Sequence, residues 1–154
     1  MPSFFFDSSA IVKRYVSETG TNWVVQQTHP RQRNGIYLAR TAGVEVVSAI
    51  TRRHRSGTIS APVATQVLAD FRFDFSTQYR LVGITPRLIQ SAMRLVEAHG
   101  LRGYDAIQLA AALQAHSRLL ARQRPALTLI SADIALNAAA VIEGLPVDDP
   151  NNHP

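Results

Sequence analysis

LTLISADIALNAAAVIEGLPV, residues 127–147, is the stretch of sequence that decides the fold class. Leu127–Ser131 is a short apolar run, which is typical of a strand buried on both faces. Ala132–Glu143 is long enough for a helix, and Gly144 is the kind of residue that ends one. Leu145–Val147 then predicts another strand. A strand, a helix and a strand in this order favour a parallel sheet with a right-handed crossover.

The same alternation of short strands and helices extends over the rest of the chain. The other predicted strands are Ser3–Asp7, Ile36–Arg40 and Leu81–Ile84. The other predicted helices are Ser8 to about Val16, Thr21–Thr28, Ala42–Arg55, one that starts after Ser60, one from Thr85-Pro86 to Gly100, and one from Tyr104 to about Ala121. We therefore predict one α/β domain, residues 1–150, in which helices flank a mainly parallel central sheet in three layers, followed by a polar tail, residues 151–154.

Two of these helices leave their packing open. In the helix 42–55, we expect Val44, Val47 and Ile50 to face the core. The end of the helix after Ser60 is ambiguous, because phenylalanines at 71, 73 and 75 alternate with charged residues as they would in a strand. The apolar face of that helix is either core or a groove for a partner; it consists of Val63, Val67, Leu68 and Phe71.

Length and composition narrow the class of protein. A chain of 154 residues suits one domain, and 46% apolar with 18% charged residues describes a folded protein rather than a disordered one. The absence of cysteine excludes disulfides and thiolate metal sites. No uncharged run approaches the roughly 20 apolar residues of a membrane span. We therefore expect a cytoplasmic protein that does not act at a membrane.

The charge of the chain is basic, and arginine supplies nearly all of it. The net charge is +5, and 15 of the 16 basic residues are arginine, with Lys13 as the exception. The planar guanidinium group suits phosphate contacts, and a basic protein attracts nucleic acid. A GC-rich genome would also favour arginine codons, whatever the function. Composition alone leaves both explanations open.

Four acidic residues stand where strands end or helices begin: Asp7, Glu45, Asp105 and Asp133. Because ligands bind beyond the carboxyl ends of parallel strands, these residues could meet at one edge of the sheet. Two carboxylates about 5 Å apart repel by roughly 3 kcal/mol at an effective dielectric constant near 20. The group would therefore take up protons or bind a cation, and an all-oxygen site without histidine or cysteine suits Mg²⁺ or Mn²⁺ rather than Zn²⁺.

Taken one at a time, the four acids also have simpler explanations. Asp7 could cap the first helix, and Asp105 and Asp133 could interact with the positive end of a helix dipole. Glu45 could be a solvated helix residue, although valines at 44, 46 and 47 favour a partly buried position. The metal site depends on all four acids coming together.

Four blocks of the sequence resemble the PIN-domain family, especially the VapC-like toxins of bacterial toxin–antitoxin pairs. They are FFFDSSAIVKRYVSETG (4–20), GVEVVSAITRR (43–53), GLRGYDAIQLAAAL (100–113) and LTLISADIALNAAAVIEGLPV (127–147). The resemblance covers nearly the whole chain, in the order and spacing of that family. Residues 31–35 and 71–79 match nothing diagnostic, and we expect the choice of substrate to depend on these and nearby loops.

The resemblance implies a PIN-like fold and an activity. Its acidic quartet matches Asp7, Glu45, Asp105 and Asp133, and would bind Mg²⁺ or Mn²⁺ and cut RNA. Asp7 and Asp105 would be the most direct ligands. Three polar residues match positions that support the site: Ser9, Ser131 and Asn137. The family also implies a homodimer and an antitoxin protein whose tail covers the active groove.

Several features allow other interpretations. Arg52, Arg53 and Arg55 either interact with the helix dipole or bind RNA phosphates. The five histidines lack metal-ligand spacing, and we expect structural or surface roles for them. A phosphatase with Asp7 as nucleophile would need an acid where Ser9 stands. The alternative from another class is a non-catalytic RNA-binding or partner-binding module with a PIN-like fold.

Overall fold

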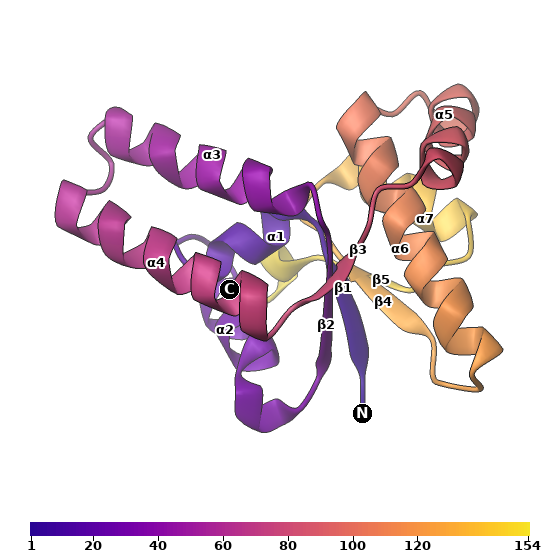
Figure 1. Cartoon of the computed structure of the whole chain (residues 1–154), viewed down its shortest axis with the longest axis horizontal. Helices are drawn as coiled ribbons and strands as arrows, with labels where there is room; N and C mark the ends of the chain where they lie inside the picture. Colours follow the sequence, from indigo (N-terminus) through magenta and orange to yellow (C-terminus); the bar gives the residue numbers. More distant parts are fainter.

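Five parallel strands form the central sheet, in the order β3-β2-β1-β4-β5 (Figure 1). The computed structural model describes residues 1–154. Its strands are β1 (Ser3–Phe6), β2 (Gly35–Ala39), β3 (Arg80–Val82), β4 (Leu127–Ile130) and β5 (Val147–Asp148). The predicted α/β class is confirmed, and every strand pair in the sheet is parallel.

Helices cover both faces of the sheet. They are α1 (Ser8–Ile11), α2 (Thr21–Thr28), α3 (Ala42–Arg55), α4 (Ala61–Thr77), α5 (Pro86–His99), α6 (Gly103–Ala121) and α7 (Ile134–Ile142), with short 3₁₀ turns η1 (Val12–Arg14), η2 (Pro30–Gln32) and η3 (Pro150–Asn152). In Figure 1, α1 to α4 lie on one side of the sheet and α5 to α7 on the other. None of these helices has both the length and the apolar character needed to span a lipid bilayer.

Each face of the sheet has its own hydrophobic core, because neighbouring side chains on a strand point to opposite faces. In β1, Phe5 belongs to the core beneath α5, α6 and α7, and Phe6 to the core beneath α1, α3 and α4. In β4, Leu129 and Ile130 divide in the same way. All four side chains are fully buried, as expected for central strands covered on both faces.

The helix α6 is the most deeply buried, as its apolar sequence predicts. Small side chains cover much of its surface, and they let it lie close to the sheet and to α5. Its buried alanines are Ala106, Ala110, Ala111, Ala112 and Ala115. The first turn of α6 therefore stands at a defined place beside the sheet, which positions the side chain of Asp105.

The buried face of α3 differs from the prediction. Ala42, Val46 and Ile50, which are four residues apart, are fully buried, whereas Val44 is 76% exposed. With 3.6 residues per turn, Val44 lies on the opposite side of the helix from Val46. Val47 is partly buried against the same core, as predicted. The prediction for Val44 was wrong because valine at 44, 46 and 47 makes two faces look equally apolar.

The ambiguous segment after Ser60 is helical to its end at Thr77. Phe71 is 1% exposed and Phe73 is 67% exposed, while Phe75 packs partly buried against the same core as Phe71. A spacing of four residues places Phe71 and Phe75 on one helix face, so the apparent alternation does not make a strand. Most of the apolar face of α4 is core, but Val63 remains 47% exposed.

Several element boundaries differ by one or more residues from the predicted ones, and the helix predicted from Ser8 to about Val16 is divided into α1 and η1. The strand β3 begins and ends earlier than Leu81–Ile84, and β5 begins later than Leu145. The helix α7 begins at Ile134, because the side chain of Asp133 caps it. Such shifts follow from caps and edge pairing, which short apolar runs do not specify.

The last residues of the chain are packed against the fold. Pro150 is buried, and the ring of His153 stacks on Trp23 of α2 with the ring centroids 4.3 Å apart. Gly20 adopts a left-handed conformation (φ 86°), and a side chain there would overlap the carbonyl oxygen of Pro150. The segment 149–154 thus covers the beginning of α2.

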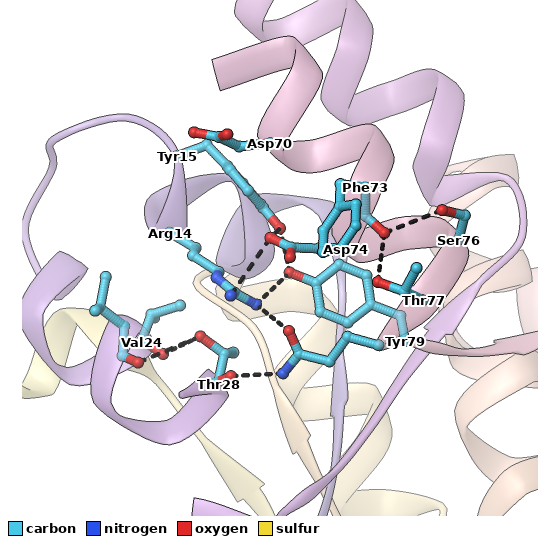
Figure 2. A network of polar contacts seen from close by, with 12 residues as sticks. Arg14, Tyr15, Val24, Thr28, Asp70, Phe73, Asp74, Ser76, Thr77 and Tyr79 are labelled. Carbon is cyan, nitrogen blue, oxygen red and sulfur yellow. Dashed lines mark hydrogen bonds and ion pairs between the residues drawn. The ribbon is translucent and has the colours of Figure 1, made fainter. Parts of the chain in front are cut away.

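A polar network joins η1 to the end of α4 (Figure 2). The guanidinium group of Arg14 donates to Gln78 Oε1 (2.8 Å) and to the Tyr79 hydroxyl (2.9 Å), and it lies 3.4 Å from Asp74 Oδ2. The Tyr15 hydroxyl donates to the same oxygen of Asp74 (2.8 Å) and contacts the hydroxyl of Tyr79. The network ties α4 to the segment that follows Asp7.

Candidate active site

Asp7 follows β1 directly and caps α1, and its carboxylate is only 4% exposed. Oδ1 accepts hydrogen bonds from Ser9 Oγ (2.7 Å) and the Ala10 amide (3.0 Å). Oδ2 accepts one from Ser131 Oγ (2.7 Å). Burial raises the pKa of this carboxyl to about 6, although its hydrogen bonds act in the opposite direction. No arginine or lysine lies against it to compensate its charge.

Two serines hold the ends of β1 and β4 together around Asp7. Ser131 is fully buried, and its Oγ accepts a hydrogen bond from the Asp133 amide (3.0 Å) while donating to Asp7. Ser9 Oγ accepts from the Ala132 amide (3.1 Å). Asn137 Nδ2 donates to the carbonyl oxygen of Ser131 (2.8 Å). These contacts place the backbone before α7 next to the start of α1.

Asp133 caps α7 at this same junction. Its Oδ1 accepts a hydrogen bond from the Leu136 amide (2.9 Å), and its Oδ2 makes no hydrogen bond within the protein. Both Asp7 and Asp133 therefore serve as helix caps; a cap was the simpler role considered for Asp7, whereas for Asp133 it was an interaction with the helix dipole. A cap uses one carboxylate oxygen, so this role does not prevent Asp133 from binding a further group.

Glu45 lies in the first turn of α3, partly buried, and faces α6. Its Oε1 accepts a hydrogen bond from Gln108 Nε2 (3.1 Å), which also donates to Ser8 Oγ (3.0 Å). Gln108 is 1% exposed, and its own Oε1 has no partner. Gln108 was not predicted as a site residue. The available signal was a polar side chain in an otherwise apolar helix, three residues after Asp105 and thus on the same face.

Asp105 is the third residue of α6 and is partly buried. Burial raises its pKa, and the negative charges of Asp133 and Glu45 raise it further, whereas Arg102 lowers it. The charge of Asp105 in turn contributes to the raised pKa of Asp7. Asp105 thus lies within electrostatic range of the other three acids, which come from three other segments of the sequence.

The four carboxylates do not close around a single point. No three aspartate, glutamate, histidine or cysteine side chains lie close enough to form a group that could hold a metal ion. The kind of donor does fit Mg²⁺ or Mn²⁺, since all four side chains offer carboxylate oxygens and no histidine is among them. The repulsion that raises the pKa of Asp105 is also the interaction that a divalent cation would relieve.

A groove of about 550 Å³ lies between α1, α3 and the start of α6, and Glu45 is the one of the four acids that lines it. Its lining residues are Ser8, Ser9, Val12, Val44, Glu45, Ser48, Ala49, Arg52 and Tyr104. The exposed side chains of Val44 and Tyr104 give it an apolar border.

The three arginines predicted as RNA contacts occupy different surroundings. Arg52 lines the groove. Arg53 forms an ion pair with Glu18, which also pairs with Lys13. Arg55 is exposed at the end of α3 and does not line the groove. Of the three, Arg52 alone stands beside the acids.

Comparisons with known proteins identify the family. No family model matches the chain. Two curated relatives from Mycobacterium tuberculosis, Ribonuclease VapC45 of strain CDC 1551 / Oshkosh and Ribonuclease VapC49 of strain ATCC 25618 / H37Rv, are each 33% identical over 113 residues, or 73% of this chain and 76% of the relative.

Solved structures share the fold at lower identity. The match to PAE2754 from Pyrobaculum aerophilum covers 99% of this chain and 92% of that protein's chain, with a TM-score of 0.67 and 17% identity. A toxin-antitoxin complex from Klebsiella pneumoniae covers 95% and 96%, with a TM-score of 0.59 and 20% identity. Mycobacterium tuberculosis VapC20, a sarcin-ricin loop cleaving toxin, covers 93% and 99%, with a TM-score of 0.60 and 17% identity. On the identity and coverage of the curated relatives, the chain belongs to the family of VapC-like PIN-domain toxins.

Proposed function

We propose that this protein is an endoribonuclease that depends on Mg²⁺ or Mn²⁺ and acts as the toxin of a toxin–antitoxin pair. The curated relatives are named ribonucleases, which supports the reaction class. The observation that carries the proposal is Asp7, a buried carboxylate with hydroxyl partners but no cationic one. A buried charge without a counter-ion is costly, and a bound cation would compensate it.

Different residues of the chain would bind the cation and orient its ligands. Asp7 and Asp105 would hold the cation, with Glu45 and Asp133 completing its surroundings. A bound Mg²⁺ or Mn²⁺ supplies an activated water and offsets the charge that develops on the phosphate. Ser9 and Ser131 orient both oxygens of Asp7, and Gln108 orients Glu45. Asn137 does not contact Asp7; it acts indirectly, by donating a hydrogen bond to the carbonyl oxygen of Ser131.

RNA would approach along the groove beside α3. Arg52 is placed to bind a phosphate there, and the exposed ring of Tyr104 offers a surface on which a base can stack. The same groove, with its apolar border, suits the tail of an antitoxin. The likeness to a toxin-antitoxin complex from Klebsiella pneumoniae supports such a partner. We also propose that the protein is a homodimer and acts in the cytoplasm.

The test needs no knowledge of the RNA target. Mn²⁺ is titrated calorimetrically into the metal-free parent, Asp105→Asn and the control Asp70→Asn, and cleavage of bulk cellular RNA is measured for each. Asp70 is an exposed carboxylate on α4, outside the site. We expect the parent and Asp70→Asn to bind Mn²⁺ and cleave RNA, and Asp105→Asn to lose both properties.

A non-catalytic binding module remains the second candidate, and one observation favours it. No three acids lie close enough to share an ion. If the folded parent binds no Mn²⁺ and cleaves no RNA, the catalytic proposal fails and the binding module takes its place. Metal binding that Asp105→Asn leaves unchanged would instead reject the assignment of the site.

A further inference from the structure

Three adjoining hollows run along the side of the molecule between α5, α6 and the starts of the strands. The first lies between α5 and α6 and shares Arg118 with the second; the second shares Tyr37, Arg80 and Arg122 with the third. The third reaches Ser3 and Gly35, the first residues of β1 and β2. Six arginines line these hollows and are called the arginine stripe here: Arg80, Arg87, Arg94, Arg118, Arg122 and Arg124.

The arginine stripe carries uncompensated positive charge. All six side chains are exposed, and none forms an ion pair. No aspartate or glutamate lines any of the three hollows. By contrast, Arg14 and Arg53 elsewhere in the molecule are each paired with an acid. Six like charges along one surface repel one another, and a polyanion would relieve this repulsion.

The surroundings of the stripe favour nucleic acid over an acidic protein. Most of the apolar lining of the hollows belongs to the core: Leu88, Leu95 and Leu119 are at most 8% exposed, and Leu81 and Leu113 are partly buried. In the first hollow, the polar residues beside the arginines are Thr85, Ser91, Gln114 and Ser117. Hydroxyl, amide and guanidinium groups are those that contact phosphates and sugars, whereas a protein interface needs an apolar centre.

The end of the stripe that Arg118, Arg122 and Arg124 form lies far from the candidate active site, whereas Arg94 lies nearer, because it lines the first hollow together with Ala110. The four acids stand where the parallel strands end, and the third hollow opens where they begin. Along α6, Asp105 and Arg118 are 13 residues apart, which at 1.5 Å per residue is about 20 Å. A nucleic-acid duplex needs about six base pairs to cover that length, at about 3.4 Å per pair. A single strand of four nucleotides in the active groove would not reach the arginines at that end of α6.

We propose that the arginine stripe is a second RNA-binding surface, which holds the backbone of a folded RNA while another part of the same molecule enters the active groove. The preferred substrate is then a structured RNA rather than a short single strand. This inference rests on the proposed ribonuclease function. It assigns to α5 and α6 a role in substrate selection that is separate from cleavage.

Binding without cleavage tests the stripe directly. A labelled RNA hairpin with a 12-base-pair stem and an unstructured four-nucleotide RNA are each titrated with the full-length protein in EDTA, at several salt concentrations. The variants are Arg118→Gln with Arg122→Gln on α6, and Arg87→Gln with Arg94→Gln on α5. The control is Asn22→Asp with Gln26→Glu, which lowers the net charge by the same two units at exposed positions of α2, outside the stripe.

We expect each stripe variant to bind the hairpin about tenfold more weakly. A plot of the logarithm of the binding constant against the logarithm of the salt concentration should also be less steep by about two units, one for each arginine that no longer binds a phosphate. Binding of the four-nucleotide RNA should change less than twofold, and the control should resemble the parent. The proposal is overturned if the control weakens hairpin binding as much as the stripe variants do, or if the stripe variants bind the hairpin as the parent does. In the second case, an acidic protein would be the occupant of the stripe that is left.

The outcome is independent of the catalytic proposal. A parent that binds the hairpin through the stripe but cleaves no RNA with Mn²⁺ would reject the ribonuclease function and leave the stripe intact. A parent that cleaves RNA while the stripe variants bind the hairpin normally would reject the stripe alone.

Discussion

Asp7 is a proposed site residue that lowers the stability of the folded protein. Its carboxylate is buried without a cationic partner, and only hydroxyl and amide groups stabilise its charge. The pKa of this carboxyl is about 6, compared with 3.8 for an unperturbed aspartate. The folded protein therefore holds the proton of Asp7 more tightly than the unfolded chain does.

The raised pKa predicts how stability depends on pH in the absence of divalent cations. As the pH rises from about 4 to about 6, the unfolded chain loses the Asp7 proton first, so the free energy of unfolding falls over that range and then levels off. We expect Asp7→Asn to reduce this fall, of which the raised pKa of Asp105 leaves a part, and to raise the free energy of unfolding at pH 7.5 by about 1–3 kcal/mol. Urea unfolding in EDTA at pH 4.5 and 7.5 measures both effects. A variant with the pH dependence of the parent would contradict the prediction.

Gln108 provides a second prediction at the residue scale. It is buried in α6 and donates to both Glu45 and Ser8. Replacing it by leucine keeps the buried volume but releases Glu45, and loss of such an orienting group typically costs 10–100-fold in metal affinity or activity. We expect Gln108→Leu to fold and to bind Mn²⁺ at least about tenfold more weakly.

The matched control for Gln108 is Gln114→Leu. Gln114 is on the same helix but lines the hollow between α5 and α6. Calorimetry of both variants separates a local effect from a general disturbance of α6. Equal weakening of Mn²⁺ binding in the two would show that Gln108 does not act through Glu45.

At the scale of elements, the network around Arg14 holds α4 in place. Helix α4 has only Ala64 and Phe71 among its buried residues, so apolar packing alone anchors it weakly along its length. The network adds hydrogen bonds from η1 to Asp74, Gln78 and Tyr79 near its end (Figure 2). Burial raises the pKa of Tyr79 to about 12 and raises that of Tyr15 also, so both hydroxyls stay protonated and can donate.

Removing the centre of this network should destabilise the fold. Arg14→Ala leaves Asp74 and the Tyr79 hydroxyl without their cationic partner, and we expect it to lower the free energy of unfolding by about 2–4 kcal/mol. Tyr15→Phe removes one hydrogen bond and should cost about 1 kcal/mol. Arg72→Ala, on the exposed face of α4, is the control and should change little. This account would be contradicted if urea titration gave Arg14→Ala and Arg72→Ala the same free energy of unfolding.

At the scale of the whole molecule, positive and negative charges are segregated. The acids gather where the strands end, whereas the arginine stripe lies along α5, α6 and the opposite edge of the sheet. The arrangement suits an enzyme that holds a polyanion at one place and cuts it at another. The net charge of +5 therefore coexists with a local excess of negative charge.

A toxin should arrest growth when it is produced alone. We expect expression of the parent in bacterial cells to stop growth, and co-expression of the antitoxin encoded beside it to restore growth. Asp105→Asn should be harmless at the same protein level, because the acid that would bind the cation is lost. Colony counts together with immunoblots measure this. Arrest by Asp105→Asn equal to that of the parent would separate toxicity from the proposed cleavage.

Much of the fold follows from local patterns. Short apolar runs, helix-length segments and the caps Thr85 and Gly100 predict most of the strands and helices, because burial on both faces and capping leave clear marks in a sequence. The face of α3 was harder to predict, since valines on two sides of a helix do not reveal which side meets the sheet. The helical course of Phe71–Phe75 likewise depended on packing against the core beneath α1 and α3.

The candidate site depends on the tertiary structure to a greater extent. The sequence by itself determined an α/β order of elements and four acids at the ends of strands or the starts of helices, because these follow from short-range patterns. The tertiary structure alone decided that Gln108 orients Glu45, that Arg53 is paired with Glu18, and that six arginines share one surface. Such contacts join residues far apart in the chain, and their distances depend on how the two helical layers pack against the sheet.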